Sequence, residues 1–333
     1  MDAISFLLII TVILVLAAEF VNGWTDAPNA IATVVATRVL PPRFAVIWAT
    51  VLNFIGTLLG VEIAKTIGKG IVAPESINLI AIVAAMASIV IWSSVAARFG
   101  LPTSESHALI AGLAGAAFTQ SGISALQWAG WQKVIIGLAF STFLGFTGAI
   151  VIMSGLYTLF RNVSVAKVNR GARLLQIFSS GFMALSHGTN DGQKFIGVMA
   201  LAFLVGGVYS EFQVLLWMKI VAAAIMGLGT AFGGWRIIRT MGVRMTKINP
   251  VQGFAAEFAS ASVIQVASHF GIPLSTTHTI NTSVMGAAAA KRFSAVRWPV
   301  AFRIIQAWIF TFPICGIISY VIAKFLGFIL GET

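Results

Sequence analysis

Long apolar stretches, separated by short polar segments, constrain the fold of this chain more than any other feature. A helix of about 20 apolar residues crosses the hydrocarbon core of a bilayer, whereas the strands of a membrane barrel alternate in polarity. Charged residues make up only 9% of the sequence, against roughly 25% in soluble domains. The sequence therefore predicts an all-α polytopic membrane protein of the cell (plasma) membrane. Its clearest apolar stretches are residues 3–20, 44–61, 77–97, 134–157, 213–233 and 299–323.

The charges and the single cysteine exclude several other classes. The net charge of +11 comes from Lys and Arg in short loops, without the interleaved aromatic residues of a nucleic-acid surface, so we expect no nucleic-acid partner. Cys315 stands alone, which excludes a disulfide framework and a thiol metal site. No nucleophile elbow, phosphate-binding Gly-Lys loop or metalloprotease helix occurs. We therefore expect neither an enzyme nor an ATP-driven pump, and no cofactor.

A polar pattern occurs twice within this apolar sequence. Residues 97–107 read ARFGLPTSESH, and residues 268–278 read SHFGIPLSTTH. Each copy follows an acidic segment that contains glycine, NGWTDAPNA at 22–30 and HGTNDGQK at 187–194. Two copies of one polar motif in an apolar chain are typical of a duplicated transporter, whose binding site lies at the interface between the repeats.

The two copies divide the chain into two repeats. Asp26 and Asp191 are 165 residues apart, and His107 and His278 are 171 apart. Nearly equal separations indicate that the duplication extends over most of the chain. We expect a first repeat over 1–160 with a broken helix at 22–30 and a hairpin tip at 102–107, a basic linker over 161–173, and a second repeat over 174–333 with a broken helix at 187–194 and a hairpin tip at 273–278.

The charges of the loops indicate that the repeats are inverted in the membrane. The positive-inside rule places basic loops on the cytoplasmic side. Their counterparts in the other repeat carry few basic residues or balance them with acids, so corresponding loops lie on opposite faces and both termini are expected outside. The basic segments, all predicted to be cytoplasmic loops, are 38–43, 161–173, 236–247 and 291–297. The counterparts of three of them are 206–212, 65–75 and 129–133.

This topology predicts that both polar hairpins are re-entrant. The chain between 236–247 and 291–297 must begin and end on one face, so we expect a hairpin with its tip near Pro273–His278. By symmetry, a hairpin with its tip near Pro102–His107 enters from outside. Gly-x-Pro breaks the helix at each tip. Two full spans joined by a buried polar turn are the alternative.

Asp26 and Asp191 are costly in a membrane, by about 2.5–3.5 kcal/mol on insertion scales, so each needs a partner, a cavity or a proton. Pro28 removes a helix hydrogen bond next to the first of them. Backbone groups freed by such a break are tolerated only inside protein or against a water-filled site. Matching clusters in both repeats favour a binding site, and two structural hydrogen-bond clusters are the alternative.

Hydroxyl side chains gather at the hairpin tips. Beside a helix start, with free N–H groups and the positive end of the helix dipole, hydroxyls suit a small oxyanion. Helix capping is the other role of Ser and Thr there, and the two roles are compatible. The residues concerned are Thr103, Ser104, Ser106, Ser275, Thr276 and Thr277.

Acidic residues near an anion seat require positive charges between them. Na⁺ ions or protons on Asp26, Asp191, Glu105 and Glu257 would neutralise the site and make anion binding depend on cation binding. Carboxylates and carbonyls of unwound helices are suitable ligands for Na⁺. Lys194 either adds a positive charge to the site or only pairs and snorkels.

At these residues the chain resembles the inorganic phosphate transporter (PiT) family, whose repeats carry a Gly-x-Asn-Asp-type break followed by a Pro-x-Ser-Thr-Thr-His hairpin. The second copy matches as GTND at 188–191 and IPLSTTH at 272–278. The first matches as GWTDAPNAIAT at 23–33 and LPTSESHALIAG at 101–112. Thr25 in place of Asn and Glu105 in place of a hydroxyl residue depart from the pattern.

The resemblance implies phosphate import driven by Na⁺ or H⁺ and a homodimer in the lipid bilayer. Because Glu105 adds a carboxylate beside the anion seat, we include it among both the substrate-binding and the cation-coupling residues. Na⁺ is expected at Asp26 and Asp191. The implied substrate-binding residues are Asp26, Asn29, Ser104, Glu105, Ser106, Asn190, Asp191, Ser275, Thr276 and Thr277. The cation-coupling residues are Thr25, Asp26, Glu105, Asn190, Asp191 and Glu257.

The sequence therefore predicts a cation (Na⁺ or H⁺) symporter that imports inorganic phosphate by alternating access. A symporter of the same fold for sulfate or another oxyanion is the nearest alternative. An anion channel is a second alternative, but it would not need carboxylates that face an anion.

Overall fold

The computed structural model describes residues 3–331, and within that range the regular elements are helices, apart from one isolated bridge between Val72 and Leu126. The all-helical class predicted from the apolar stretches is confirmed. The first half contains α1 (Ala3–Ala36), α2 (Pro42–Leu58), α3 (Glu62–Gly70), α4 (Leu79–Arg98), α5 (Glu105–Ser121) and α6 (Trp128–Leu159). The second half contains α7 (Val165–His187), α8 (Gln193–Val205), α9 (Leu216–Phe232), α10 (Trp235–Arg239), α11 (Pro250–His269), α12 (Thr276–Ala289) and α13 (Trp298–Leu330).

Three long helices define the length of the molecule. Helices α1, α6 and α13 have 34, 32 and 33 residues, which is about 50 Å of helix at 1.5 Å per residue. By length and composition five helices could cross a membrane (α1, α4, α5, α6 and α13), or up to seven if the bent pairs α2–α3 and α9–α10 each count as one span. The described part of the chain is therefore a multi-pass membrane protein.

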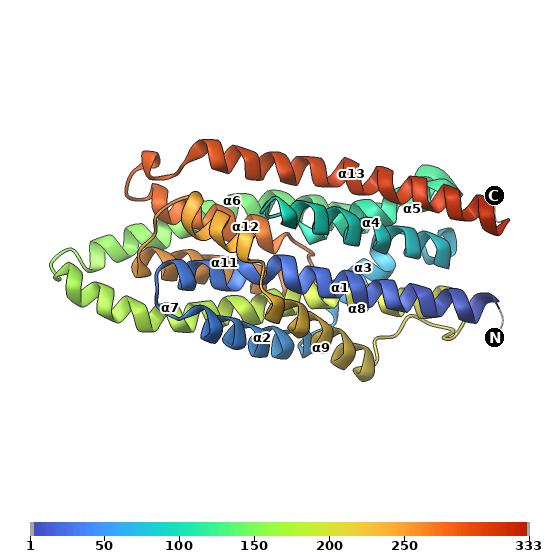
Figure 1. The fold of residues 1–333 in the computed structure, drawn as a ribbon, viewed down its shortest axis with the longest axis horizontal. Coiled ribbons are helices and arrows are strands. Elements are labelled where there is room, and N and C mark those ends of the chain that lie inside the picture. The colour runs from blue at the N-terminus through green and yellow to red at the C-terminus, as the bar shows by residue number, and fades with distance from the viewer. Residues whose placement is uncertain (1–2, 332–333) are drawn as a thin grey trace.

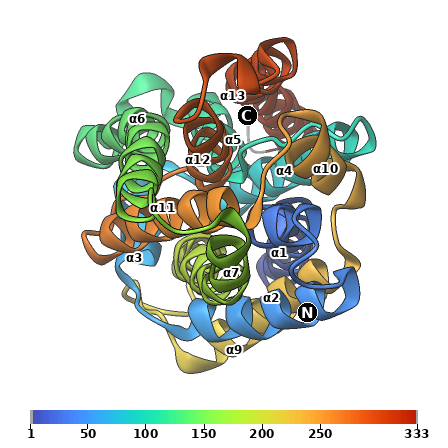
Figure 2. The same cartoon turned by 90° about the vertical axis from the view of Figure 1, so that its left-hand side faces the viewer.

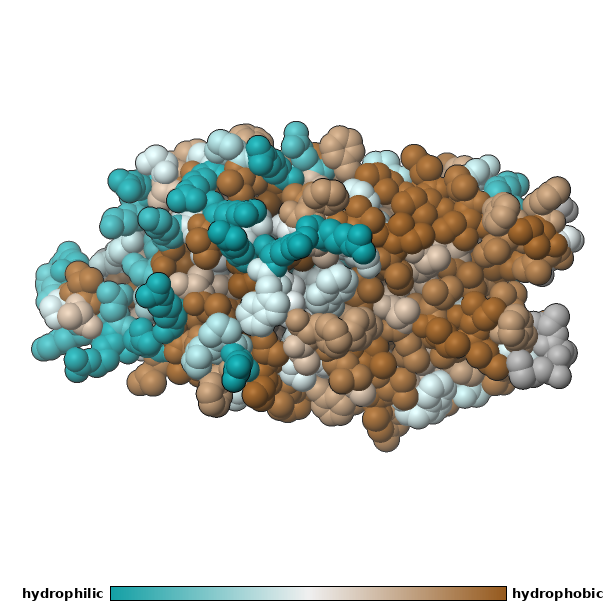
Figure 3. Space-filling model, viewed as in Figure 1, coloured by the Kyte–Doolittle hydropathy of each residue, from teal (hydrophilic) through white to brown (hydrophobic). Residues whose placement is uncertain are grey.

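The surface and the ends of the bundle agree with this reading. The start of α1 and the end of α13 lie at one end of the bundle, and the connection between α6 and α7 lies at the other (Figure 1). Apolar side chains cover most of the visible face, while hydrophilic residues gather toward the end that carries the α6–α7 connection (Figure 3). Arg161, Lys167 and Arg170 are exposed on that connection and the start of α7.

Two helical hairpins reach the middle of the bundle from opposite ends. Helices α4 and α5 lie in the half that holds the start of α1 and the end of α13, whereas α11 and α12 lie in the other half (Figure 1). Each first arm ends at a glycine with positive φ, Gly100 at 67° and Gly271 at 63°, a conformation that disfavours other residues. The side chain of Ser104 caps α5, and the side chain of Ser275 caps α12. Both tips therefore have one local design.

The two halves follow one order of elements. The bent pair α2–α3, at 66°, corresponds to α9–α10, at 58°. Seen from the end with the α6–α7 connection, α1 and α7 lie next to each other, with α2 and α9 on one side and α11 on the other (Figure 2). Helix α12 of the second half packs on α6 of the first, and α5 of the first packs on α13 of the second. The halves are thus interleaved.

Two apolar cores lie on either side of a polar middle layer. One core joins α3, α4, α5 and α8 to the first part of α1. The other joins α7, α11 and α12 to the last part of α1. Between them, α1, the α7–α8 junction and both hairpin tips carry buried polar side chains. The fold therefore concentrates its polar groups at one level.

Two predictions about local structure are wrong. Helix α1 stays helical through 22–30 with Pro28 inside it, because packing against α9 and α10 compensates for the missing hydrogen bond. Segment 236–247 is not simply a loop, since α10 and the π-helical turn η4 (Thr240–Arg244) occupy most of it and bury Ile237, Ile238 and Met241. At 187–194 the chain does leave the α-helical pattern, as the π-helical turn η3 (Gly188–Gly192).

Candidate functional site

Polar side chains from four elements meet in the middle layer. Helix α1 contributes Asp26 and Asn29, while the α7–α8 junction contributes His187, Asp191 and Lys194. The hairpin tips add hydroxyl groups from α5 and α12. All five of these residues are at most 2% exposed. The charges that Asp26, Asp191 and Lys194 carry must therefore be compensated inside the protein.

The carboxylate of Asp191 is surrounded by donors. Lys194 Nζ forms an ion pair with Oδ1. Thr276 Oγ1 donates to Oδ2 over 2.7 Å, and His187 Nε2 lies 3.1 Å from the same oxygen. The spacing of three and four residues places Lys194 and His187 on the same side of the α7–α8 junction as Asp191. Both oxygens of this carboxylate are therefore engaged.

Asp26 is held more loosely. Thr277 Oγ1 lies 3.1 and 3.2 Å from its two oxygens and donates to them. His187 Nε2 is 3.9 Å from Oδ2. The structure thus brings together the two acids and the two threonines that the repeated motifs predict, with the second hairpin facing both acids.

The orientation of His187 leaves one ring nitrogen between the acids. Asn53 Nδ2 donates to Thr230 Oγ1 over 3.1 Å, so its carbonyl oxygen faces His187 Nδ1, also at 3.1 Å. Nδ1–H therefore donates to Asn53, and Nε2 faces Asp26 and Asp191. Ligand atoms of these three residues all lie within 4.8 Å of one another. Their meeting point suits a positive charge, whether a cation or a proton on the ring.

The first hairpin tip reaches the same layer through Ser106. Its hydroxyl accepts from Lys194 Nζ and donates to the carbonyl oxygen of Leu274 over 2.8 Å. Lys194 also donates to the Leu274 carbonyl over 3.0 Å. One lysine therefore joins both hairpin tips to Asp191.

Asn29 occupies the corresponding place on α1. Its amide donates to Thr277 Oγ1 over 3.0 Å and lies 3.4 Å from Thr276 Oγ1. Asn29 follows Asp26 by three residues, as Lys194 follows Asp191. The two half-sites therefore share this spacing, but the second carries a charge at Lys194 where the first has the neutral Asn29.

The two residues that depart from the family pattern contact each other. Thr25 Oγ1 donates to Glu105 Oε1 over 3.0 Å, and Ser93 donates to Oε2 over 2.8 Å. No ion pair to Glu105 occurs within residues 3–331. The changes at 25 and 105 thus form one buried unit beside the first half-site.

Glu257 does not lie with the other predicted site residues. It accepts hydrogen bonds from Thr33, Ser179 and Gln176. Thr33 follows Asp26 by seven residues, which is about 10 Å along a helix. The predicted grouping of Glu257 with the central acids is therefore not seen, and the residue forms a second polar cluster toward the end with the α6–α7 connection.

Three further predicted residues have roles of their own in the structure. Ser104 Oγ and Ser275 Oγ accept from the backbone N–H groups of His107 and His278, each over 3.2 Å. They cap α5 and α12, and so orient both helix starts toward the middle layer. Asn190 donates to Ser268 over 2.9 Å and does not contact the two acids.

Sequence reasoning missed His187 and Glu19 and left the role of Lys194 open. Glu19 is fully buried and accepts from Asn22 over 3.0 Å. His187 stands where the first repeat has Asn22, so a comparison of like residues passes over it. Its position four residues before Asp191 was the available signal, because that spacing puts both side chains on one helix face.

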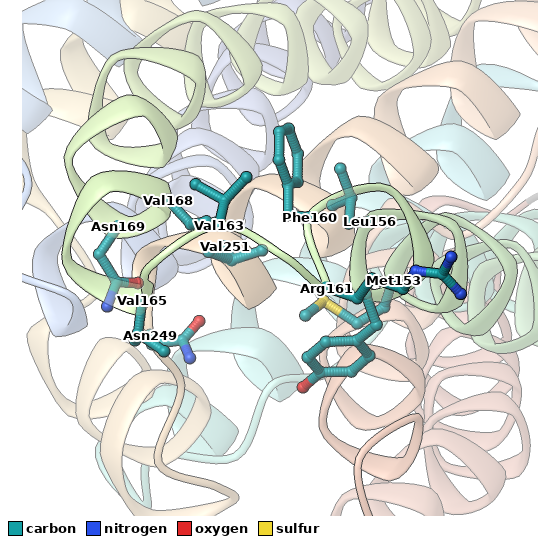
Figure 4. Close-up of a pocket in the computed structure, with 11 residues that line it drawn as sticks. Met153, Leu156, Phe160, Arg161, Val163, Val165, Val168, Asn169, Asn249 and Val251 are labelled. Carbon is teal, nitrogen blue, oxygen red and sulfur yellow. The ribbon is translucent and has the colours of Figure 1, made fainter.

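A surface cavity lies away from this site. It has a volume of about 250 Å³ and opens beside the α6–α7 connection, near the start of α11 (Figure 4). Apolar side chains such as Met153, Leu156 and Val168 form most of its wall. None of the central acids lines it, so the cavity and the polar middle layer are separate features.

Comparisons with known proteins identify similar sequences and a similar fold. The profile described as the phosphate transporter family matches residues 22–319. A probable low-affinity inorganic phosphate transporter of Rhizobium meliloti (strain 1021) is 43% identical, over 96% of this chain and 97% of its own. One of Bacillus subtilis (strain 168) is 37% identical, over 98% and 100%. A solved structure described as the sodium-dependent phosphate transporter has a TM-score of 0.88 at 22% identity, over 97% of this chain and all of that one.

Proposed function

Because this chain belongs to the phosphate transporter family, we propose that it imports inorganic phosphate by cation symport through alternating access. The family resemblance predicted from the paired motifs is confirmed, and the relatives are transporters rather than enzymes. The observation that carries the proposal is the meeting of two buried acids with both hairpin tips at one level.

Phosphate would bind at the hairpin tips. The starts of α5 and α12 face the middle layer, and the N–H groups of a first helical turn favour an anion. Thr276 and Thr277 now donate to the two acids. A cation at Asp26 would release Thr277 to donate to phosphate instead. The substrate would then bind only after its coupling ion.

Charge compensation makes the coupling obligatory in this scheme. Phosphate beside uncompensated carboxylates is repelled, and buried charges interact strongly at low dielectric. The point between Asp26, His187 and Asp191 can hold the compensating charge as Na⁺ or H⁺. The name of the structural neighbour makes Na⁺ the first ion to test.

Alternating access would use the two interleaved halves. One hairpin approaches the site from each end of the bundle (Figure 1), as inverted repeats over 1–160 and 174–333 would arrange them. The basic connection over 161–173 would face the cytoplasm and both termini the outside of the plasma membrane. We expect a homodimer, whose mass light scattering in detergent would measure.

Uptake of labelled phosphate into proteoliposomes under imposed Na⁺ or H⁺ gradients tests the proposal. We expect gradient-dependent uptake of phosphate, with little competition from sulfate. Sulfate uptake in place of phosphate would make the chain a sulfate symporter. Flux that only follows phosphate down its own gradient would indicate a channel.

Asp191→Asn tests the site itself. The amide cannot carry the charge that pairs with Lys194, so we expect transport to be lost while the variant elutes as folded protein. Normal uptake by this variant would remove Asp191 from the mechanism.

A further inference from the structure

The ammonium group of Lys194 lies in a cage of oxygen atoms. Its three N–H bonds match three acceptors, Asp191 Oδ1, Ser106 Oγ and the carbonyl oxygen of Leu274. Ser106 donates its own hydroxyl hydrogen to Leu274, so its oxygen is free to accept from the lysine. The side chain of Lys194 is 1% exposed. A carboxylate, a hydroxyl and a carbonyl are also the ligand types that hold Na⁺ in transporters.

The acceptors of this ammonium link it to both hairpin tips. A buried ammonium needs an acceptor for each of its three N–H bonds, and Asp191 supplies one of them. The other two come from Ser106 of the first tip and Leu274 of the second. Those tips come from opposite ends of the bundle (Figure 1). The ammonium therefore lies where a coupling ion would lock both hairpins to the second acid.

The matching position in the first repeat has no such charge. Asn29 stands three residues after Asp26, as Lys194 stands three after Asp191. Its amide donates to Thr277, which in turn donates to Asp26. Asp26 has no lysine or arginine partner within residues 3–331. Only the first half-site must therefore obtain its compensating charge from solution.

We propose that the Lys194 ammonium is a tethered cation, which takes the place of a second mobile coupling ion at Asp191. This inference rests on the proposed symport of phosphate. Because the tethered charge is never exchanged with solution, each phosphate is coupled to one mobile cation fewer than a chain with a neutral residue at 194 would use. The residue at position 194 then sets the number of mobile cations coupled to each phosphate.

Lys194→Asn tests the proposal by giving the second half-site the residue of the first. Proteoliposomes with the membrane potential clamped at zero are loaded until net flux stops, under a series of Na⁺ or H⁺ gradients. The logarithm of the inside-to-outside phosphate ratio is then plotted against the logarithm of the outside-to-inside cation ratio. The slope of this plot gives the number of cations coupled to each phosphate. We expect the slope to rise by one, so that a tenfold gradient accumulates about tenfold more phosphate.

Asn29→Lys is the reciprocal variant. A second tethered ammonium beside Asp26 should lower the slope by one. Lys65→Asn is the matched control, since Lys65 also pairs with an acid three residues before it, Glu62, at 2.9 Å, but both side chains are more than half exposed. We expect this control to keep the wild-type slope.

Binding of ²²Na⁺ to purified protein gives a readout that does not depend on transport. If Na⁺ is the coupling ion, Lys194→Asn should bind one more ion per chain than wild type. An unchanged slope in folded Lys194→Asn, or a folded variant that binds no phosphate at any Na⁺ or H⁺ concentration, would overturn the proposal. If Lys194→Asn does not fold, an unchanged slope in Asn29→Lys overturns it. Wild type that fails to accumulate phosphate refutes the proposed symport instead, and the ion count still decides the role of Lys194.

Discussion

Thr277→Val should weaken phosphate transport strongly while keeping the shape of the site. Valine has nearly the volume of threonine but no hydroxyl, so the change removes the two contacts to Asp26 at 3.1 and 3.2 Å. It also removes the hydroxyl that accepts from the Asn29 amide. The Asn29 amide nitrogen then keeps its longer contact, at 3.4 Å, to Thr276 Oγ1. Among residues 3–331, the polar side chain that then remains near the Asp26 carboxylate is His187, at 3.9 Å.

The size of the effect follows from these contacts. A hydrogen bond to a charged group contributes about 1.5–3 kcal/mol. If Thr277 donates to phosphate in the loaded site, its loss should raise the KM for phosphate by roughly 10-fold to 150-fold. Thr277→Ser keeps the donor and should stay within a few-fold of wild type.

Initial rates of labelled phosphate uptake into proteoliposomes, measured over a range of phosphate concentrations, give the KM of wild type and of each variant. Thermal stability in detergent shows whether each variant is folded. A folded Thr277→Val with KM and maximal rate within twofold of wild type would refute the role of this hydroxyl in binding.

Three further changes test other parts of the structure. A Cβ at Gly56 would lie 3.0 Å from the backbone carbonyl carbon of Leu185 and closer still to its oxygen. Gly56→Ala should therefore destabilise the packing of α2 on α7 by about 1–3 kcal/mol and lower the Tm in detergent. An unchanged Tm would contradict this. Glu105→Gln keeps the shape of the residue but removes its charge, so we expect an altered cation dependence of uptake without loss of folded protein, and an identical dependence would exclude Glu105 from coupling. Thr66 Oγ1 donates to the Gly271 carbonyl over 2.8 Å, so Thr66→Val should release the second hairpin and change the uptake rate more than the Tm; a rate equal to wild type would show that this bond does not hold the hairpin.

The sequence predicted the helical class, the two hairpin tips and most of the side chains that meet at the centre. These features depend on local signals: long apolar stretches, Gly-x-Pro breaks and hydroxyls at helix starts. Thr25 and Glu105 stand out in the sequence because they depart from the family pattern, and they form a hydrogen-bonded pair in the structure.

Other features depend on tertiary contacts that the sequence does not show. Pro28 suggests a broken helix, but neighbouring helices hold α1 together. Glu257 was grouped with the central acids by residue type, whereas its level on α11 places it beside Thr33. His187 had no counterpart of its own type in the first repeat, so its position between the two acids emerged only from the fold.

Counter-gradient accumulation of phosphate tests the proposed symport most directly. Proteoliposomes containing wild-type protein are given equal phosphate inside and outside, a clamped potential and an inward Na⁺ or H⁺ gradient. We predict that internal phosphate rises above its electrochemical equilibrium and returns to it when an ionophore collapses the cation gradient. Internal phosphate that stays at equilibrium under both gradients would contradict the coupling of the two buried acids to transport.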